Sequence, residues 1–152
     1  MKTYLALLLF ALTPLTGTPI DSDNQLKSTA LHAVDLLFFQ GDNQAFIELV
    51  SPTAERKTGG QGSAVEGLKK QKEGSFTRAS ATEIIFVTPQ NIADLKEEYP
   101  DDMWDQHRAS VHLKDGLGCL VLVDVGKEKK GMMFFALKEI DGQIRITYFD
   151  DN

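Results

Sequence analysis

The chain has 152 residues and a mass of 16.8 kDa, which allows one ordinary domain and excludes a second one with its own core. Its 42% hydrophobic and 25% charged residues are typical of folded soluble domains and exclude a disordered chain. The formal net charge of −6 disfavours general binding to nucleic acids. The single cysteine, Cys119, excludes an internal disulfide, so stability must come from packing.

The first residues are typical of a secretory signal peptide. A short positive start at residues 1–4 precedes an unbroken apolar run at 5–12, and Pro14 and Gly17 end that run. The run is too short for a comfortable membrane span. We therefore expect residues 1–18 to be removed on export to the periplasm or the cell exterior. Residues 19–152 would then form one domain without stable membrane insertion.

Helix signals come first in the mature chain. Ser22 and Gln25 have the spacing of a capping box, apolar residues then recur at helical intervals, and Gly41 predicts the helix end. Asp42 is expected to cap a second, shorter helix that stops near Ser51 and Pro52 or starts another turn there. These signals predict a helical hairpin.

A third helix is expected after the glycine-rich stretch 59–62. Ser63 and Glu66 repeat the capping-box spacing, and the helix should end near Gly74. Amides at such a helix start can bind phosphate. The P-loop ending and a preceding strand are missing, so we interpret the stretch as a connector.

The second half of the chain is expected to be mostly β-strand. Residues 76–87 are rich in β-branched and aromatic side chains, and Pro89 and Pro100 bracket a short helix. The rest is interpreted as an antiparallel meander with two-residue turns at Asp115-Gly116 and Asp141-Gly142. Its expected strands are 108–114, 117–125, 132–140 and 143–149.

Two segments carry a resemblance to a known family. The stretch Leu-Leu-Phe-Phe-Gln-Gly-Asp at 36–42, with 45–46 and 49–52 after it, resembles the helix-Gly-Asp-helix opening of exported members of the nuclear-transport-factor-like, or cystatin-like, superfamily. Residues 141–146 resemble their final hairpin. The resemblance implies an α+β fold in which a curved antiparallel sheet wraps the N-terminal helices into a cone. It also implies an apolar pocket, used by relatives for small ligands, isomerase or dehydratase chemistry, or protein contacts.

Four side chains are candidates for the edge of such a pocket. Tyr99, Trp104 and Tyr148 are aromatic residues with a polar tip, which suits a site that is part apolar and part wet. His112 joins them because a hairpin at Asp115-Gly116 would place it beside Cys119. We expect these four residues to bind a ligand.

The same pairing raises the question of catalysis, because a thiol beside an imidazole can act as a nucleophile. Apolar neighbours on that strand face favour a buried, unreactive Cys119, so we expect no catalytic residue. Asp105, His107 and His112 are possible metal ligands by type. The five-residue spacing of the histidines along a strand would direct them to opposite faces, so we expect no metal and no cofactor.

The charges are uneven along the chain. Residues 94–105 contain six acids and one lysine, whereas 56–78 are basic. A solvated face explains both runs; the functional alternative is a partner surface. In that alternative Asp101, Asp102 and Asp105 would attract a cationic partner, and Trp104 would anchor it unless it belongs to the core.

Three functions therefore remain open. The leading hypothesis is an exported non-enzymatic binding domain with an apolar pocket for a small ligand or a sheet face for a protein. The second is an inhibitor or immunity-type module that binds a cationic partner. The third is an isomerase-like, dehydratase-like or hydrolytic enzyme. Polar groups deep in a pocket would favour the enzyme, and a closed core with an exposed acidic ridge would favour the interaction module.

Overall fold

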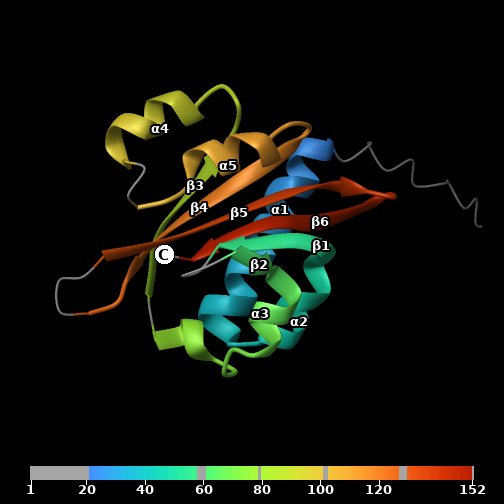
Figure 1. Ribbon diagram of the computed structural model, residues 1–152, viewed down its shortest axis with the longest axis vertical. Helices are drawn as coiled ribbons and strands as arrows, with labels where there is room; N and C mark the ends of the chain where they lie inside the picture. Colours follow the sequence, from blue (N-terminus) through green and yellow to red (C-terminus); the bar gives the residue numbers. More distant parts are fainter. Residues whose placement is uncertain (1–20, 58–60, 79, 101–102, 127–129, 152) are drawn as a thin grey trace, which may run out of the picture.

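The computed structural model describes residues 21–57, 61–78, 80–100, 103–126 and 130–151 (Figure 1). Helices from the N-terminal part of the chain pack on one face of a mixed sheet, and two later helices cover the other face. The α+β class and the packing of N-terminal helices on a sheet are confirmed, in an arrangement consistent with a cone-like fold. The expected signal peptide, Asp101 and Asp102 lie outside the described residues.

The first helix, α1 (Ser22–Val34), continues into a π-helical turn, η1 (Asp35–Gln40). Gly41 ends it with a φ of 70°, a left-handed conformation that glycine adopts without strain. The expected capping box at Ser22 is wrong by one residue, because the cap is Asp21, whose side chain accepts a bond from the amide of Asp23. The expected cap at Asp42 is confirmed: its carboxylate accepts from the amide of Ala45 at 2.8 Å and starts α2 (Asn43–Leu49).

The chain then enters the sheet directly. The strand β1 (Val50–Lys57) begins where the sequence suggested a helix end or a further turn, and β2 (Gln61–Ser63) pairs with it. Ser63 caps α3 (Ala64–Lys69) as expected, although this helix ends well before Gly74. A short 3-10 turn, η2 (Ser75–Arg78), precedes the next strand.

The remaining elements follow in chain order: β3 (Ser80–Val87), α4 (Ile92–Glu98), α5 (Gln106–His112), β4 (Gly116–Asp124), β5 (Lys130–Ile140) and β6 (Gln143–Asp151). The strand expected at 108–114 is wrong, because this segment forms α5. Asp105 caps α5 through the amide of Arg108 at 2.9 Å, and Ala109 and Leu113 face the core at helical spacing. Asp115, with a φ of 57°, joins α5 to β4 and is not a hairpin turn between strands.

The strand order is β2-β1-β6-β5-β4-β3. All described pairs are antiparallel except β1 with β6, which is parallel, so the expected purely antiparallel sheet is corrected to a mixed one. One neighbour of β1 is the adjacent strand β2, and the other is the last strand, β6, a pairing that no turn signal encodes.

The final hairpin has the expected start and a shift farther on. The turn at Asp141-Gly142 pairs Ile140 with Gln143 and Leu137 with Ile146, as its two-residue length predicts. A bulge then pairs Ala136 with Tyr148, so Thr147 is an extra residue. Tyr148 therefore lies on the opposite face from Ile146, although strict alternation places the two on one face.

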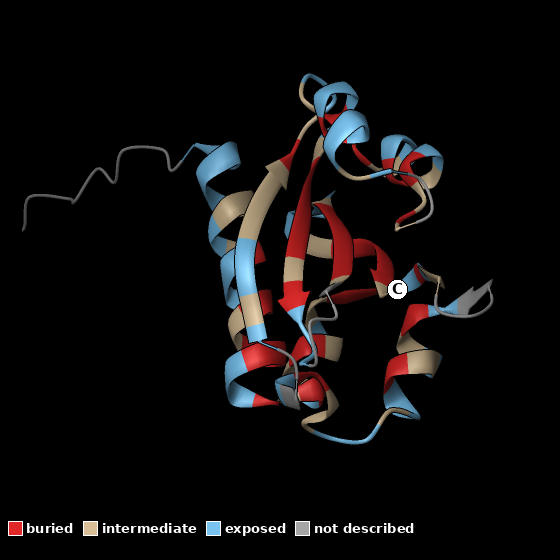
Figure 2. Cartoon of the chain, turned by 90° about the vertical axis from the view of Figure 1, so that its left-hand side faces the viewer, coloured by how far each residue is buried: buried red, intermediate tan, exposed pale blue. Residues whose placement is uncertain are grey.

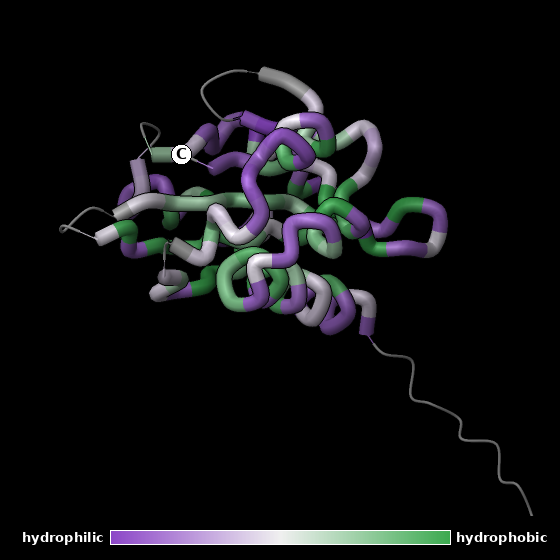
Figure 3. The backbone as a smooth tube through the Cα atoms, turned by 90° about the horizontal axis from the view of Figure 1, so that it is seen from below, coloured by the Kyte–Doolittle hydropathy of each residue, from purple (hydrophilic) through white to green (hydrophobic). Residues whose placement is uncertain are grey.

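Two cores result, one on each face of the sheet (Figures 2 and 3). Between the N-terminal helices and the sheet, Phe46 contacts Phe135 and Phe149 edge-on, with ring centroids 6.3 and 5.6 Å apart. Phe76 joins this cluster 6.1 Å from Phe149. Aromatic side chains therefore occupy the layer in which the sequence suggested a pocket. The second core, beneath α4 and α5, is built around Trp104, Phe134 and Tyr148.

Candidate functional site

The four candidate ligand residues lie in one layer. His112 stacks on Tyr148, with ring centroids 4.8 Å apart and planes at 12°. Trp104 packs 5.1 Å from Phe134, which lies 6.1 Å from Tyr148. Tyr99 packs against the same second core. The fold thus brings Tyr148 of β6 together with three residues from the segment 99–112.

This layer is closed to solvent at its centre. Trp104 is 1% exposed and Tyr148 is 0% exposed. The indole Nε1 of Trp104 donates to the backbone oxygen of Tyr99 at 3.0 Å, and the side-chain amide of Gln106 donates to the same oxygen. Trp104 is therefore part of the core, which was the alternative to an exposed anchor, and it presents no area to a partner.

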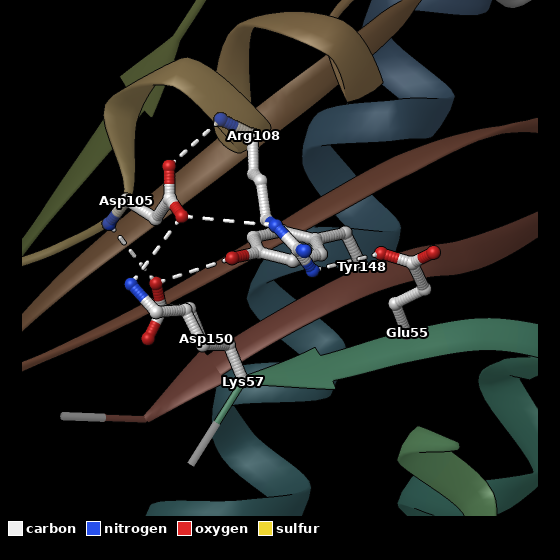
Figure 4. A network of polar contacts seen from close by, with 6 residues as sticks. All are labelled: Glu55, Lys57, Asp105, Arg108, Tyr148 and Asp150. Carbon is white, nitrogen blue, oxygen red and sulfur yellow. Dashed lines mark hydrogen bonds and ion pairs between the residues drawn. The ribbon is translucent and has the colours of Figure 1, made fainter. Parts of the chain in front are cut away.

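A network of polar contacts joins α5 to the sheet beside these aromatic residues (Figure 4). The Oδ2 atom of Asp150 accepts hydrogen bonds from the hydroxyl of Tyr148 at 3.2 Å and the amide of Asp105 at 3.1 Å. Asp150 is 2% exposed, and its Oδ1 atom has no hydrogen-bond partner among the described residues. Burial raises the pKa of Asp150, and burial together with the nearby Asp150 carboxylate raises the pKa of Tyr148.

The outer part of the network is ionic. Asp105 lies 3.3 Å from the amine of Lys57 and 3.7 Å from Nε of Arg108, and Arg108 also pairs with Glu55 at 3.2 Å. The hydrogen bond from the Arg108 amide lowers the pKa of Asp105, and the charges of Lys57 and Arg108 act in the same direction. Asp105, expected to meet a partner, is instead engaged in capping α5 and in these ion pairs.

This network joins α5, β6 and β1, and its central groups are not exposed to solvent. An acid with a raised pKa next to a phenol is a pair that can donate protons. Both side chains are buried, so the contacts they make serve to hold the start of α5 against β6 and β1. Sequence reasoning missed Asp150, Lys57 and Arg108. Asp150 follows the last strand expected from the sequence, 143–149. The pairing of β1 with β6 places it opposite Lys57, and α5 adds Arg108.

The pairing of His112 with Cys119 is wrong. His112 lies at the end of α5 and stacks on Tyr148, whereas Cys119 lies in β4 and packs in the first core, on the other face of the sheet. Cys119 is 0% exposed, and burial raises its pKa to about 12. The thiol is thus an unreactive core group.

A second polar feature lies at the surface. Asp94, Glu97 and Glu98 of α4 are exposed, and so is Glu83 of β3. The hydroxyl of Tyr99 donates to Glu98 at 3.2 Å. Burial raises the pKa of Tyr99, and the hydrogen bond to Glu98 and the charges of Glu98 and Glu83 act in the same direction. We call these four carboxylates the α4–β3 acidic surface.

A groove of about 430 Å³ lies between α1 and the β5–β6 hairpin. It is open, and it is lined by uncharged polar residues of α1 together with Leu49, Ile144 and the Gly142–Gln143 turn. This groove differs from the enclosed apolar pocket that the family resemblance implied.

Comparison with protein-family models finds no match for this chain, and comparison with curated proteins finds no significant match. By its fold, the chain is an α+β protein whose described residues form a six-stranded mixed sheet with helices on both faces. None of the helices in the described part of the chain is long and apolar enough to cross a membrane.

Proposed function

We propose that this chain is an exported, non-enzymatic interaction domain that binds a cationic protein partner through the α4–β3 acidic surface. The observation that carries the proposal is that α4 and β3 both carry exposed carboxylates beside the second core: Glu98 accepts from the Tyr99 hydroxyl at 3.2 Å, and Glu83 lies on the strand whose Ile85 packs on the same core as Tyr99. Asp94 and Glu97 add exposed negative charge on the same helix. Such a surface increases the rate of encounter with a basic partner and disfavours acidic ones.

Burial favours binding over catalysis. The acid–phenol pair of Asp150 and Tyr148 is shielded from solvent, so a substrate has no direct access to it. A general acid must come within hydrogen-bond distance of the group that it protonates. The carboxylates of the α4–β3 acidic surface are exposed, which suits recognition.

Packing favours a protein partner over a small apolar ligand. The layer between the N-terminal helices and the sheet contains Phe46, Phe135 and Phe149 in mutual edge-on contact, and all three are buried. Both sheet faces also carry buried clusters beneath helices. A partner would therefore meet the outside of α4 and the neighbouring strand.

The test compares two charge reversals in the mature chain. The Glu83→Lys/Glu98→Lys double variant changes the acidic surface, and Glu48→Lys on α2 changes an exposed glutamate of a helix that packs at the β1–β6 side of the sheet. Proteins bound from an extract of the native host are identified by mass spectrometry, and their association rates are measured at low and high salt. We expect basic proteins to bind the wild type and the Glu48→Lys variant, and we expect the double variant not to bind them. Equal binding by both variants would overturn the proposal.

A further inference from the structure

The strand β3 forms an end of the sheet. It is the last strand in the order β2-β1-β6-β5-β4-β3, and β4 pairs with one of its sides. Figure 2 looks onto this end of the molecule, where β3 runs in front with much of its length partly or fully exposed. A strand with an open side offers unpaired amides and carbonyls to another extended chain.

The contacts of Asn91 indicate which backbone groups face outward. Its side chain donates to the carbonyl of Phe86 at 2.8 Å and accepts from the amide of Thr88 at 2.7 Å. In an antiparallel pair alternate residues direct both backbone groups to the same side. Phe86 and Thr88 therefore face away from β4, and by the same alternation so does Ile84.

The ends of this edge are protected and its middle is open. A bulge between Ala81 and Glu83 disrupts the first part of β3, and Asn91 occupies the carbonyl of Phe86 at the other end. Bulges of this kind discourage unintended pairing. Within the described part of the chain no strand pairs with this side of β3, so the outward donor and acceptor of Ile84 and the outward amide of Phe86 remain for an added strand.

The two sides of β3 differ chemically. Ile84 and Phe86 pack toward the first core, and the amine of Lys27 lies 5.9 Å above the Phe86 ring. Ile85 packs toward the second core together with Tyr99, the Tyr99 hydroxyl donates to Glu98 at 3.2 Å, and the exposed Glu83 lies two residues before Ile85 on the same strand. An added strand would place alternate side chains beside these two surfaces. Basic residues suit the carboxylate side, and apolar residues suit the side of Ile84 and Phe86, where Lys27 is already paired with Asp23 at 2.7 Å.

Charge also distinguishes a partner from a second copy of this chain. Two β3 strands paired edge to edge would bring two copies of Glu83 and Glu98 into one interface, which is unfavourable. We propose that β3 accepts an extended segment of the partner, with alternating basic and apolar residues, as an additional strand of the sheet. This inference rests on the proposed function and specifies how the cationic partner is bound.

The first test uses four peptides with capped ends, each eight residues long, the length of β3. The first peptide alternates lysine and valine, and the second has the same composition with its lysines in one block. The third and fourth are the alternating peptide with backbone N-methylation at every second residue and at the remaining residues, respectively. Calorimetry at low and high salt measures binding to the mature chain. We expect the alternating peptide to bind, and at least one methylated form to bind about tenfold more weakly, because methylation removes donors to the sheet edge.

The second test alters the protein. Ile84→Pro removes the outward amide without changing charge, and Glu83→Lys reverses the charge beside it. Both should weaken binding of the alternating peptide, whereas Glu48→Lys should not. Circular dichroism and melting curves check that each variant is folded. If Ile84→Pro does not fold, the methylated peptides still test whether the edge of β3 binds a strand.

The results separate the two proposals. Strand addition would be overturned if the alternating peptide, the peptide with its lysines in one block and the methylated peptides all bound equally and in a salt-dependent way. That result would leave the proposal of a cationic partner in place. Sedimentation that shows a dimer abolished by Ile84→Pro would also overturn it, because the edge would then be occupied by a second copy. A partner recovered from the host that is insensitive to Glu83→Lys/Glu98→Lys would overturn the proposed function itself.

Discussion

At the scale of single residues, burial controls the chemistry of the second core. His112 stacks on the fully buried Tyr148, and burial lowers the pKa of His112 below its ordinary value of 6.5. The charges of Lys138 and Arg108 act in the same direction, and that of Glu55 opposes them. The folded state therefore favours a neutral imidazole.

This shift predicts a pH dependence of stability. The unfolded chain takes up a proton on His112 near pH 6.5, and the folded chain does so only at lower pH. The stabilisation is fully present above the unfolded pKa and is lost as the pH falls below it. His112→Phe keeps an aromatic ring against Tyr148 and removes the titration. Urea unfolding should show a smaller loss of stability on acidification in the variant than in the wild type.

The wild type has a second contribution of opposite sign. Burial raises the pKa of Asp150, so its contribution to stability falls as the pH rises from 3.8 toward the folded value. The comparison of His112→Phe with the wild type isolates the histidine, because Asp150 is present in both. Identical pH slopes for the two proteins would contradict the assignment.

At the scale of elements, the final hairpin combines a turn that the sequence predicts with a bulge that it does not predict. Its turn sets the pairing of Leu137 with Ile146, and Ile146 is 0% exposed in the first core. Alternation then fails at Thr147, where the bulge carries Tyr148 to the other face. The extra residue thus decides which core each of the two aromatic side chains enters, Tyr148 the second and Phe149 the first.

The register predicts different costs for two isoleucines of β6. Ile146→Ala should lower the free energy of unfolding by about 2–5 kcal/mol, because it removes buried methyl groups and leaves a cavity. Ile144→Ala is the matched control, since Ile144 is only partly buried at the edge of the same cluster and should cost less. Thermal and urea unfolding measure both. Equal losses for the two variants would show that the pairing of Leu137 with Ile146 is wrong.

At the scale of the whole molecule, export remains a prediction from the sequence. The positive start and the apolar run at 5–12 predict cleavage between about residues 15 and 20. Intact-mass measurement of the protein isolated from its host should give a chain that has lost this segment and is found outside the cytoplasm. A cytoplasmic chain that begins at Met1 would refute the prediction.

The sequence by itself determined the features that depend on neighbouring residues. The cap at Asp42, the left-handed Gly41 and the hairpin at Asp141-Gly142 follow from local turn and capping chemistry, so they were predictable. The α+β class followed from the order of helical and strand patterns. Tyr99, Trp104, His112 and Tyr148 were selected by the type of their side chains, and the sequence did not predict the contacts that join them.

Only the tertiary structure decided the rest. A short segment such as 106–112 fits both periodicities, and its burial against the sheet selected the helix. The parallel pairing of β1 with β6 joins residues almost a hundred positions apart, and the network of Lys57, Asp105 and Asp150 depends on it. Such contacts depend on how the whole chain packs and not on the residues nearby, which is why the site and the open edge at β3 could be found only in the folded protein.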